Sequence, residues 1–259
     1  MSTGARMLAI LDAFSETRPA WTVEEICDEL RFTRPTGYRY VRELCNAGLI
    51  LRLTGGMYVV GPRILELDLL IRSRDPLLQV AHPIMRDVVD QSGGDVLLAN
   101  VYGDQVMNVH REYGPTPASI SYDRGRPLPM FRGSTAKAAL AFMPRIQLKR
   151  IYEKKAKECN RAGLGSTWKE FRAAMAAIRR DGYVIGQGEL DSHVIGIAAP
   201  IFAEDERILG SLTLIVSKVH YKIMDQTRLI ELVLEASRRT TAALSRISKS
   251  KTAQENNAR

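Results

Sequence analysis

Apolar residues in the first third of the chain recur with the period of amphipathic helices. Four of them predict the buried face of a first helix: Met7, Ile10, Leu11 and Phe14. Thr22 and Glu25 have the T-x-x-E spacing of a capping box, which predicts the start of a second helix. A third helix is expected after Thr33, whose side chain can cap it, with Pro35 in its first turn and Gly48 at its end. Two helices separated by about three residues have helix-turn-helix spacing.

A short hairpin is predicted directly after the third helix. Residues 49–53 and 57–60 have the composition of two short strands, and Thr54-Gly55-Gly56 between them is a turn signal. A hairpin that follows the second helix of a helix-turn-helix is a wing. Residues 1–61 are therefore expected to form a winged helix-turn-helix, an all-α domain with a β-wing.

Beyond the wing, the pattern predicts an α+β domain with an antiparallel sheet. A linker helix is expected from Pro62 to about residue 73, because a residue before proline, here Asp75, disfavours helical geometry. The next helix stops at Gly93-Gly94. Strands are then expected over 96–102, 105–111, 118–122, 194–202 and 207–217, and helices over 134–143, 145–158, 167–181 and 224–247.

The length of 259 residues agrees with one or two compact domains. The predicted elements divide it into a winged domain (1–61), a linker helix (62–75), a domain large enough to enclose a small molecule (76–248) and a frayed polar tail (249–259). Each boundary is an expectation from the pattern alone.

The composition is that of an ordinary water-soluble globular protein, with 45% hydrophobic and 25% charged residues. The longest apolar run, 194–203, is too short for a transmembrane helix, which needs about twenty residues, and the N-terminus lacks a secretory signal. Cys27, Cys45 and Cys159 are odd in number and form no C-x-x-C pair. We therefore expect a reduced, cytoplasmic protein with no membrane segment.

Positive charge is concentrated in the predicted helix-turn-helix. Lys and Arg number 37 against 29 acids overall, which suits a polyanionic partner, and residues 31–63 carry six arginines and only Glu43. If the apolar stripe of the third helix is buried, five residues point outward: Pro35, Thr36, Tyr38, Arg39 and Arg42. Arg39 and Arg42 are the expected readers of guanine in the major groove. Three further arginines are placed for contacts to phosphates: Arg34, Arg52 and Arg63. The acids of the second helix are expected on a solvated face away from DNA.

Short motifs follow one another over nearly the whole chain. They begin with W-T-V-E-E-I and lie at 21–26, 33–41, 56–67, 125–129, 136–142, 180–183, 188–190 and 197–202. With these motifs the chain resembles the IclR family of bacterial transcriptional regulators. The resemblance implies a winged helix-turn-helix, a linker helix and a C-terminal effector-binding domain of GAF-like topology. It also implies a homodimer, or a dimer of dimers, on a palindromic operator in double-stranded DNA.

Four positions depart from the family pattern. Arg31 stands where the turn usually has Gly, and Gly37 where a bulkier side chain is usual. Ala136 replaces a usual Gly, and Gly196 a frequent Cys. A non-Gly residue at positive φ is strained, and a Gly inside a helix costs about 1 kcal/mol relative to Ala. No predicted DNA-contacting residue changes, whereas Ala136 and Gly196 alter the expected effector pocket.

The segment Arg132-Gly-Ser-Thr135 at the start of a predicted helix is a candidate anion site. A helix N-terminus offers free N–H groups, and a guanidinium can hold a carboxylate with two hydrogen bonds. The resemblance implies an effector pocket here, with the candidate positions Met130, Arg132, Gly133, Ser134, Thr135, Gly196, Thr213 and Ile215. We expect a small organic acid, aromatic acids included, with its carboxylate at Arg132 and Ser134. The alternative is that Ser134 only caps the helix and Arg132 is solvated.

Signals of catalysis or cofactor binding are absent from the sequence. It has no G-x-S-x-G motif, P-loop or dinucleotide fingerprint. Glu189 and His193 have a spacing that binds metals on helices, but they precede a predicted strand. We expect a ligand-responsive DNA-binding regulator with no catalytic residues, metal or cofactor. Two alternatives stay open: a small-molecule-binding protein or enzyme whose N-terminal domain only mediates assembly, and a regulator whose pocket has decayed so that it binds DNA constitutively.

Overall fold

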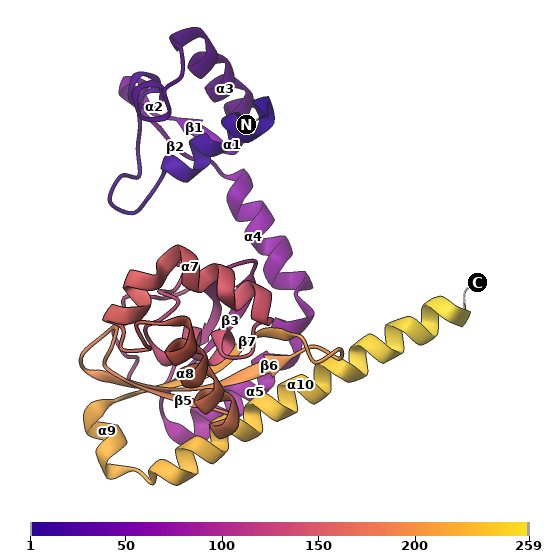
Figure 1. Cartoon of the computed structure of the whole chain (residues 1–259). Helices are drawn as coiled ribbons and strands as arrows, with labels where there is room; N and C mark the ends of the chain where they lie inside the picture. The colour runs from indigo at the N-terminus through magenta and orange to yellow at the C-terminus, as the bar shows by residue number, and fades with distance from the viewer. Residues whose placement is uncertain (1, 258–259) are drawn as a thin grey trace. The chain divides into compact units, whose positions relative to one another are not determined.

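The chain forms two compact units, Met1–Asp75 and Pro76–Arg259 (Figure 1). The structure is a computed structural model, and it describes residues 2–257. The first unit contains α1 (Thr3–Ala13), α2 (Val23–Leu30), α3 (Arg34–Asn46), β1 (Ile50–Arg52), β2 (Tyr58–Val60) and α4 (Arg63–Arg74). β1 and β2 pair antiparallel around a short 3-10 turn at Thr54–Gly56. The predicted winged helix-turn-helix architecture is therefore confirmed.

Local sequence chemistry explains where these helices begin and end. Thr22 and Glu25 form the predicted capping box, since the Thr22 hydroxyl accepts the Glu25 N–H while the Glu25 carboxylate accepts the Thr22 N–H. Arg31 ends α2 in the left-handed conformation, with φ of 55°. The prediction that the Thr33 side chain caps α3 is wrong, because its hydroxyl lies 2.9 Å from the hydroxyl of Thr36 instead.

Gly37 allows α2 and α3 to pack closely. It is buried on the inner face of α3, and a Cβ built there would lie 2.2 Å from the Sγ of Cys27 on α2. Cys27 is itself 1% exposed. The thiol of Cys27 therefore occupies the space that a larger side chain at position 37 would fill.

The second unit is built on a five-stranded antiparallel sheet with the order β4-β3-β7-β6-β5. Its strands are β3 (Asp95–Tyr102), β4 (Gln105–Glu112), β5 (Val184–Gln187), β6 (Val194–Phe202) and β7 (Ile208–Ser217). Its helices are α5 (Pro76–Ser92), α6 (Ser134–Leu140), α7 (Arg145–Arg161), α8 (Trp168–Asp181), α9 (Lys218–Ile223) and α10 (Gln226–Asn257). One core joins α5 and α10 to one face of the sheet, and a second core joins α6, α7 and α8 to the other. The predicted α+β class and antiparallel sheet are confirmed.

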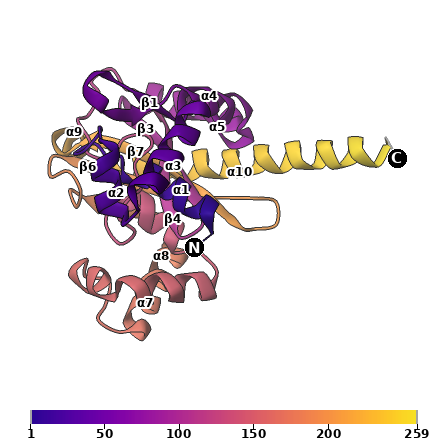
Figure 2. The same cartoon turned by 90° about the horizontal axis from the view of Figure 1, so that it is seen from above.

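Some predicted elements of the second unit are wrong. The expected strand 118–122 is an irregular segment, because side chains bind its backbone: the Ala118 N–H donates to Asp95 and the Ala118 carbonyl accepts from Arg111. The short β5 and α9 were not expected. α10 continues through Asn257, past the predicted end near residue 247 (Figure 2). The last two positions of the predicted frayed tail lie outside the described residues.

A β-bulge changes which side chains of β4 share a face. Leu98 pairs with His110, but the next residue, Ala99, pairs with Asn108, so Val109 is the extra residue. Paired residues lie on the same face of a sheet, and Leu98 belongs to the core under α5 while Ala99 belongs to the core under α6. The bulge therefore directs His110 toward the α5 face and Asn108 toward the α6 face.

Candidate functional sites

A shallow groove lies between α3 and the wing. It is lined by Pro35, Tyr38, Arg39, Val41, Arg42, Cys45, Arg52 and Tyr58. Five of the eight predicted DNA-contacting residues therefore lie together in one groove, including Arg52 from β1. The other three lie outside its lining: Arg34, Thr36 and Arg63. Arg34 and Arg63 are exposed at the N-termini of α3 and α4, where phosphates could reach them.

Two of these residues already have partners on α2. The Tyr38 hydroxyl donates to the Glu24 carboxylate at 2.5 Å, and this hydrogen bond lowers the pKa of Glu24 and raises the pKa of Tyr38. Arg34 pairs with Asp28 at 3.2 Å. The expectation that the acids of α2 face away from this surface is wrong for Glu24 and Asp28. The two helices cross closely at Gly37, so the polar side of α2 borders the start of α3.

The remaining arginines of the surface are more accessible. The Arg39 guanidinium lies 5.3 Å from the ring centre of Tyr40, and Arg39 is exposed. Arg42 has a 70% exposed side chain and pairs only with its neighbour Glu43, at 3.4 Å, among the residues described. Weak exposed pairs of this kind are broken at little cost when a phosphate or base edge competes.

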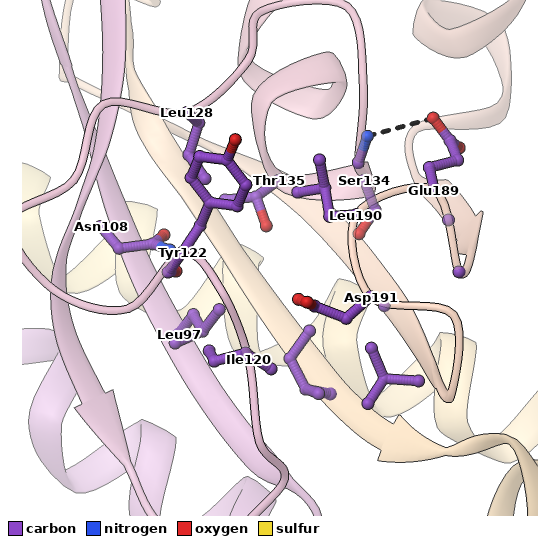
Figure 3. A pocket seen from close by; sticks show the side chains of 16 residues that line it. Leu97, Asn108, Ile120, Tyr122, Leu128, Ser134, Thr135, Glu189, Leu190 and Asp191 are labelled. Atoms are coloured by element: carbon purple, nitrogen blue, oxygen red, sulfur yellow. Dashed lines mark hydrogen bonds between the residues drawn. The ribbon is translucent and has the colours of Figure 1, made fainter. Parts of the chain in front are cut away.

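A cavity opens on the α6 side of the sheet in the second unit (Figure 3). It holds about 460 Å³ of space, open solvent at its mouth included. Its apolar walls come mainly from Leu97, Ile120, Tyr122, Leu128, Leu190, Val194 and Ile215. The polar or small residues of its lining are Asn108, Gly133, Ser134, Thr135, Gly186, Gly188, Glu189, Asp191 and Gly196. Apolar walls with a few placed polar groups are typical of small-molecule sites.

Five of the eight predicted effector residues line this cavity: Gly133, Ser134, Thr135, Gly196 and Ile215. Thr213 lies beneath it, fully buried, with its hydroxyl 2.9 Å from that of Thr135. Met130 is 3% exposed and packs in the core under α6. Arg132 lies outside the lining, because its guanidinium donates to the carbonyl oxygen of Glu189. The alternative that Ser134 caps the helix is wrong, since Gly133 is the N-cap residue, while Arg132 is exposed.

The start of α6 already holds a carboxylate of the protein. Glu189 accepts the Gly133 N–H at 3.1 Å, the bond drawn in Figure 3, and pairs with Lys137 at 2.5 Å. The Lys137 side chain is 11% exposed and that of Glu189 is 29% exposed. The predicted anion site at the start of α6 is thus occupied by a carboxylate of the protein, from a residue 56 positions further along the chain.

Asn108 is a polar residue of the cavity that the sequence did not single out. It is 1% exposed and its amide N–H donates to the Tyr122 carbonyl at 2.7 Å. Its Oδ1 atom is buried and has no hydrogen-bond partner in the described structure. A buried acceptor without a donor is costly unless a ligand or water supplies one.

Two glycines keep the strands close to Ser134. A Cβ at Gly196 would lie 2.5 Å from the Ser134 Oγ, and a Cβ at Gly186 would lie 2.9 Å from the Ser134 nitrogen. Gly196 was predicted from the sequence as an effector position and as a departure from the family pattern. In the structure it widens the cavity beside Ser134 and Ile215.

A buried ion pair holds the opposite wall of the cavity. Arg111 donates to Asp95 at 2.7 Å, to Asp123 at 2.8 Å and to the Ala118 carbonyl at 2.5 Å. Burial would lower the pKa of Arg111, but the hydrogen bonds to Asp95 and Asp123 keep it above its ordinary value. Arg111 thus fixes the irregular segment that carries Ile120 and Tyr122.

Family models match both units. The model for the IclR helix-turn-helix domain matches residues 5–53, and the model for the C-terminal domain of the bacterial transcriptional regulator IclR matches residues 71–242. The chain belongs to the IclR family. The resemblance noted in the sequence is confirmed, and the family consists of transcriptional regulators.

Individual IclR-family proteins match most of the chain at low identity. The regulator KipR of Bacillus subtilis is 22% identical, over 82% of this chain and 84% of its own length. The Pca regulon regulatory protein of Pseudomonas putida is 25% identical, over 92% of this chain and 82% of its own length. A putative IclR regulator from Silicibacter has a TM-score of 0.78 at 22% identity, covering 94% of this chain and 96% of its own. An IclR homologue from Microbacterium hydrocarbonoxydans, complexed with 4-hydroxybenzoate, has a TM-score of 0.74 at 23% identity, covering 94% of this chain and 99% of its own. No helix among the described residues is long and apolar enough to cross a membrane.

Proposed function

We propose that the chain is a cytoplasmic regulator, without catalytic activity, that binds a palindromic operator as a homodimer or dimer of dimers. Its α3 helix enters the major groove, where Arg39 and Arg42 read base edges, and Arg34, Arg52 and Arg63 bind phosphates. The observation that carries this proposal is the groove that brings Pro35, Tyr38, Arg39, Arg42 and Arg52 together. Thr36 lies beside it on the same helix.

We further propose that the cavity binds a small organic acid that also carries a hydrogen-bond donor. The donor meets the unpartnered Oδ1 of Asn108, and the carbon skeleton, aromatic rings included, lies between Leu97, Ile120 and Tyr122. The 4-hydroxybenzoate bound to the Microbacterium homologue is a ligand of this chemical class.

The carboxylate of such an acid is expected near Ser134, at the start of α6. There it competes with Glu189 for the Gly133 N–H and for Lys137. Because Glu189 lies between β5 and β6, displacing it moves the segment that joins these strands. A ligand that prefers the displaced arrangement shifts the protein toward it by its difference in affinity, and this is the proposed origin of the response.

The DNA-binding proposal is tested with fluorescence anisotropy on the DNA flanking its own coding region, across a salt series. Arg39→Ala is expected to lower affinity for the specific site about tenfold or more, and to reduce sequence preference. Arg180→Ala is the matched control, because its side chain is 77% exposed on α8 of the second unit. If the protein instead binds every DNA equally, and Arg39→Ala does not change this binding, then the helix-turn-helix mediates assembly only.

The effector proposal is tested by calorimetric titration of 4-hydroxybenzoate and benzoate. Wild type is expected to bind 4-hydroxybenzoate roughly tenfold more tightly than benzoate, because only the former has a hydroxyl to donate to Asn108. Asn108→Leu is expected to abolish that preference. Ligand recovered unchanged after incubation is the result expected for a regulator. Conversion of the ligand would favour the enzyme alternative, and no binding of any acid would favour the decayed pocket.

A further inference from the structure

Three side chains with metal-binding atoms converge between α5 and the edge strand β4. The Nε2 atom of His82 lies 3.0 Å from Oε1 of Glu112, and the Nε2 atom of His110 lies 2.6 Å from the same oxygen. The ligand atoms of all three residues lie within 4.8 Å of one another. The imidazole rings are 5.6 Å apart between their centres.

The β-bulge at Val109 separates this cluster from the cavity. His110 and Glu112 are two residues apart and share the face toward α5, which carries His82. Asn108, on the other side of the bulge, lines the cavity instead. The cluster is therefore a second site, and neither the DNA-binding surface nor the cavity uses its residues.

We propose that His82, His110 and Glu112 bind a divalent transition-metal ion, with zinc as the best fit. Two imidazole nitrogens and one carboxylate oxygen form a known zinc ligand set. Bond lengths near 2.0–2.1 Å in a tetrahedron place ligand atoms about 3.3 Å apart, so small rotations of these side chains admit the ion. Both imidazole nitrogens already lie close to one carboxylate oxygen, so a small outward movement of the three side chains would make room for the ion between them.

Burial and charge determine how open the site is. The Glu112 side chain is 15% exposed and that of His110 is 23% exposed, while His82 is 43% exposed and leaves the site accessible to solvent. The fourth position of the tetrahedron is therefore free for water or an external ligand. Arg86 opposes binding electrostatically, with its Nε 3.7 Å from Glu112 Oε2, but it pairs with the other carboxylate oxygen and is 67% exposed.

A bound ion would join α5 to β4. It would bind the folded second unit and not the unfolded chain, so it would raise the unfolding temperature in proportion to its affinity and concentration. Binding would also weaken at low pH, because imidazoles must be deprotonated to act as ligands.

The test is zinc titration of the full chain, prepared without a histidine tag, by equilibrium dialysis with metal analysis. Wild type is expected to bind one zinc ion per chain and to show an increased unfolding temperature with zinc. His82→Gln and Glu112→Gln are expected to bind zinc at least tenfold more weakly and to lose that increase. His220→Gln is the matched control, since His220 lies on α9 and should leave zinc binding unchanged.

Cobalt gives an independent measurement. Wild type loaded with Co²⁺ is expected to show the visible absorption bands of a four-coordinate ion, and His82→Gln is expected not to. The proposal is overturned if wild type binds no zinc, or if His82→Gln and Glu112→Gln bind it as tightly as wild type does. The unfolding temperatures without metal verify that each variant folds.

Discussion

Replacing Gly37 with alanine sets two effects of opposite sign against each other inside α3. Alanine is favoured over glycine in a helix interior by about 1 kcal/mol. Against this, the added Cβ would lie 2.2 Å from the Sγ of Cys27, and both residues are buried. Overpacking of a well-packed core costs about 1–3 kcal/mol. We therefore expect Gly37→Ala to destabilise the first unit by about 1 kcal/mol net.

Shortening Cys27 removes the cause of the clash. In Cys27→Ala the nearest remaining atoms to a Cβ at position 37 are Val23 Cγ1 at 3.6 Å and the Cβ of residue 27 at 3.8 Å, which are ordinary contacts. Cys27→Ala alone should cost about 1 kcal/mol through the small void it leaves. The double variant fills that void and keeps the helical preference of alanine, so its stability should be close to that of wild type. The coupling energy expected between the two sites is about 1–3 kcal/mol.

The two tryptophans allow the first unit to be followed separately. Trp21 lies in the first unit and Trp168 in the second, so a Trp168→Phe background reports the first unit through Trp21 fluorescence. The free energy of unfolding is measured by urea denaturation under reducing conditions for the four members of the cycle. If the Gly37→Ala variant has a higher free energy of unfolding than its parent, the reasoning is refuted, because the Cys27 thiol must then move aside at little cost.

Three further variants test single contacts. Asp28→Asn releases Arg34 from its ion pair at 3.2 Å, so DNA affinity measured by anisotropy should rise about two- to fivefold at low salt, an increase that vanishes in Arg34→Ala. Gly196→Ala brings a Cβ to 2.5 Å from the Ser134 Oγ and should weaken acid binding at least tenfold by calorimetry, while DNA binding without ligand stays within twofold. Arg111→Met leaves the buried Asp95 carboxylate without its cation and should lower the free energy of unfolding of the second unit by about 3–5 kcal/mol, followed through Trp168; a loss below about 1 kcal/mol would contradict the anchoring role.

Elements fixed by local chemistry were predictable from the sequence. α2 begins at a capping box that its own residues complete, and α3 ends before Gly48, which has the positive φ of 70° that glycine tolerates. The segment 118–122 was not predictable, because Asp95 and Arg111 bind its backbone from other parts of the chain. Its apolar pattern is that of a strand, yet its hydrogen-bonding groups are already used.

The β-bulge explains why the buried acceptor of the cavity could not be found in the sequence. Regular alternation along β4 would place Asn108, His110 and Glu112 on one face. The extra residue Val109 moves Asn108 to the cavity face, so the sequence pattern does not suggest the cavity acceptor. Alternation does place His110 and Glu112 together, but it does not show that His82 on α5 lies beside them. Bulges depend on how two strands pair, and the sequence of one strand does not specify that.

The start of α6 shows a different limit of sequence reasoning. The start of a helix beside an arginine was predicted to favour a carboxylate, and in the structure the protein supplies one itself, since Glu189 is held by the Gly133 N–H and Lys137. An acid that binds the Gly133 N–H and Lys137 takes these partners from Glu189. The Glu189 side chain is only 29% exposed, so its charge would then be partly buried without a cation unless the side chain moves. We therefore expect binding of an acid and movement of the segment with Glu189 to be coupled by charge. The same coupling is expected to make the site selective for acids, since a neutral ligand of equal shape would gain nothing from displacing Glu189.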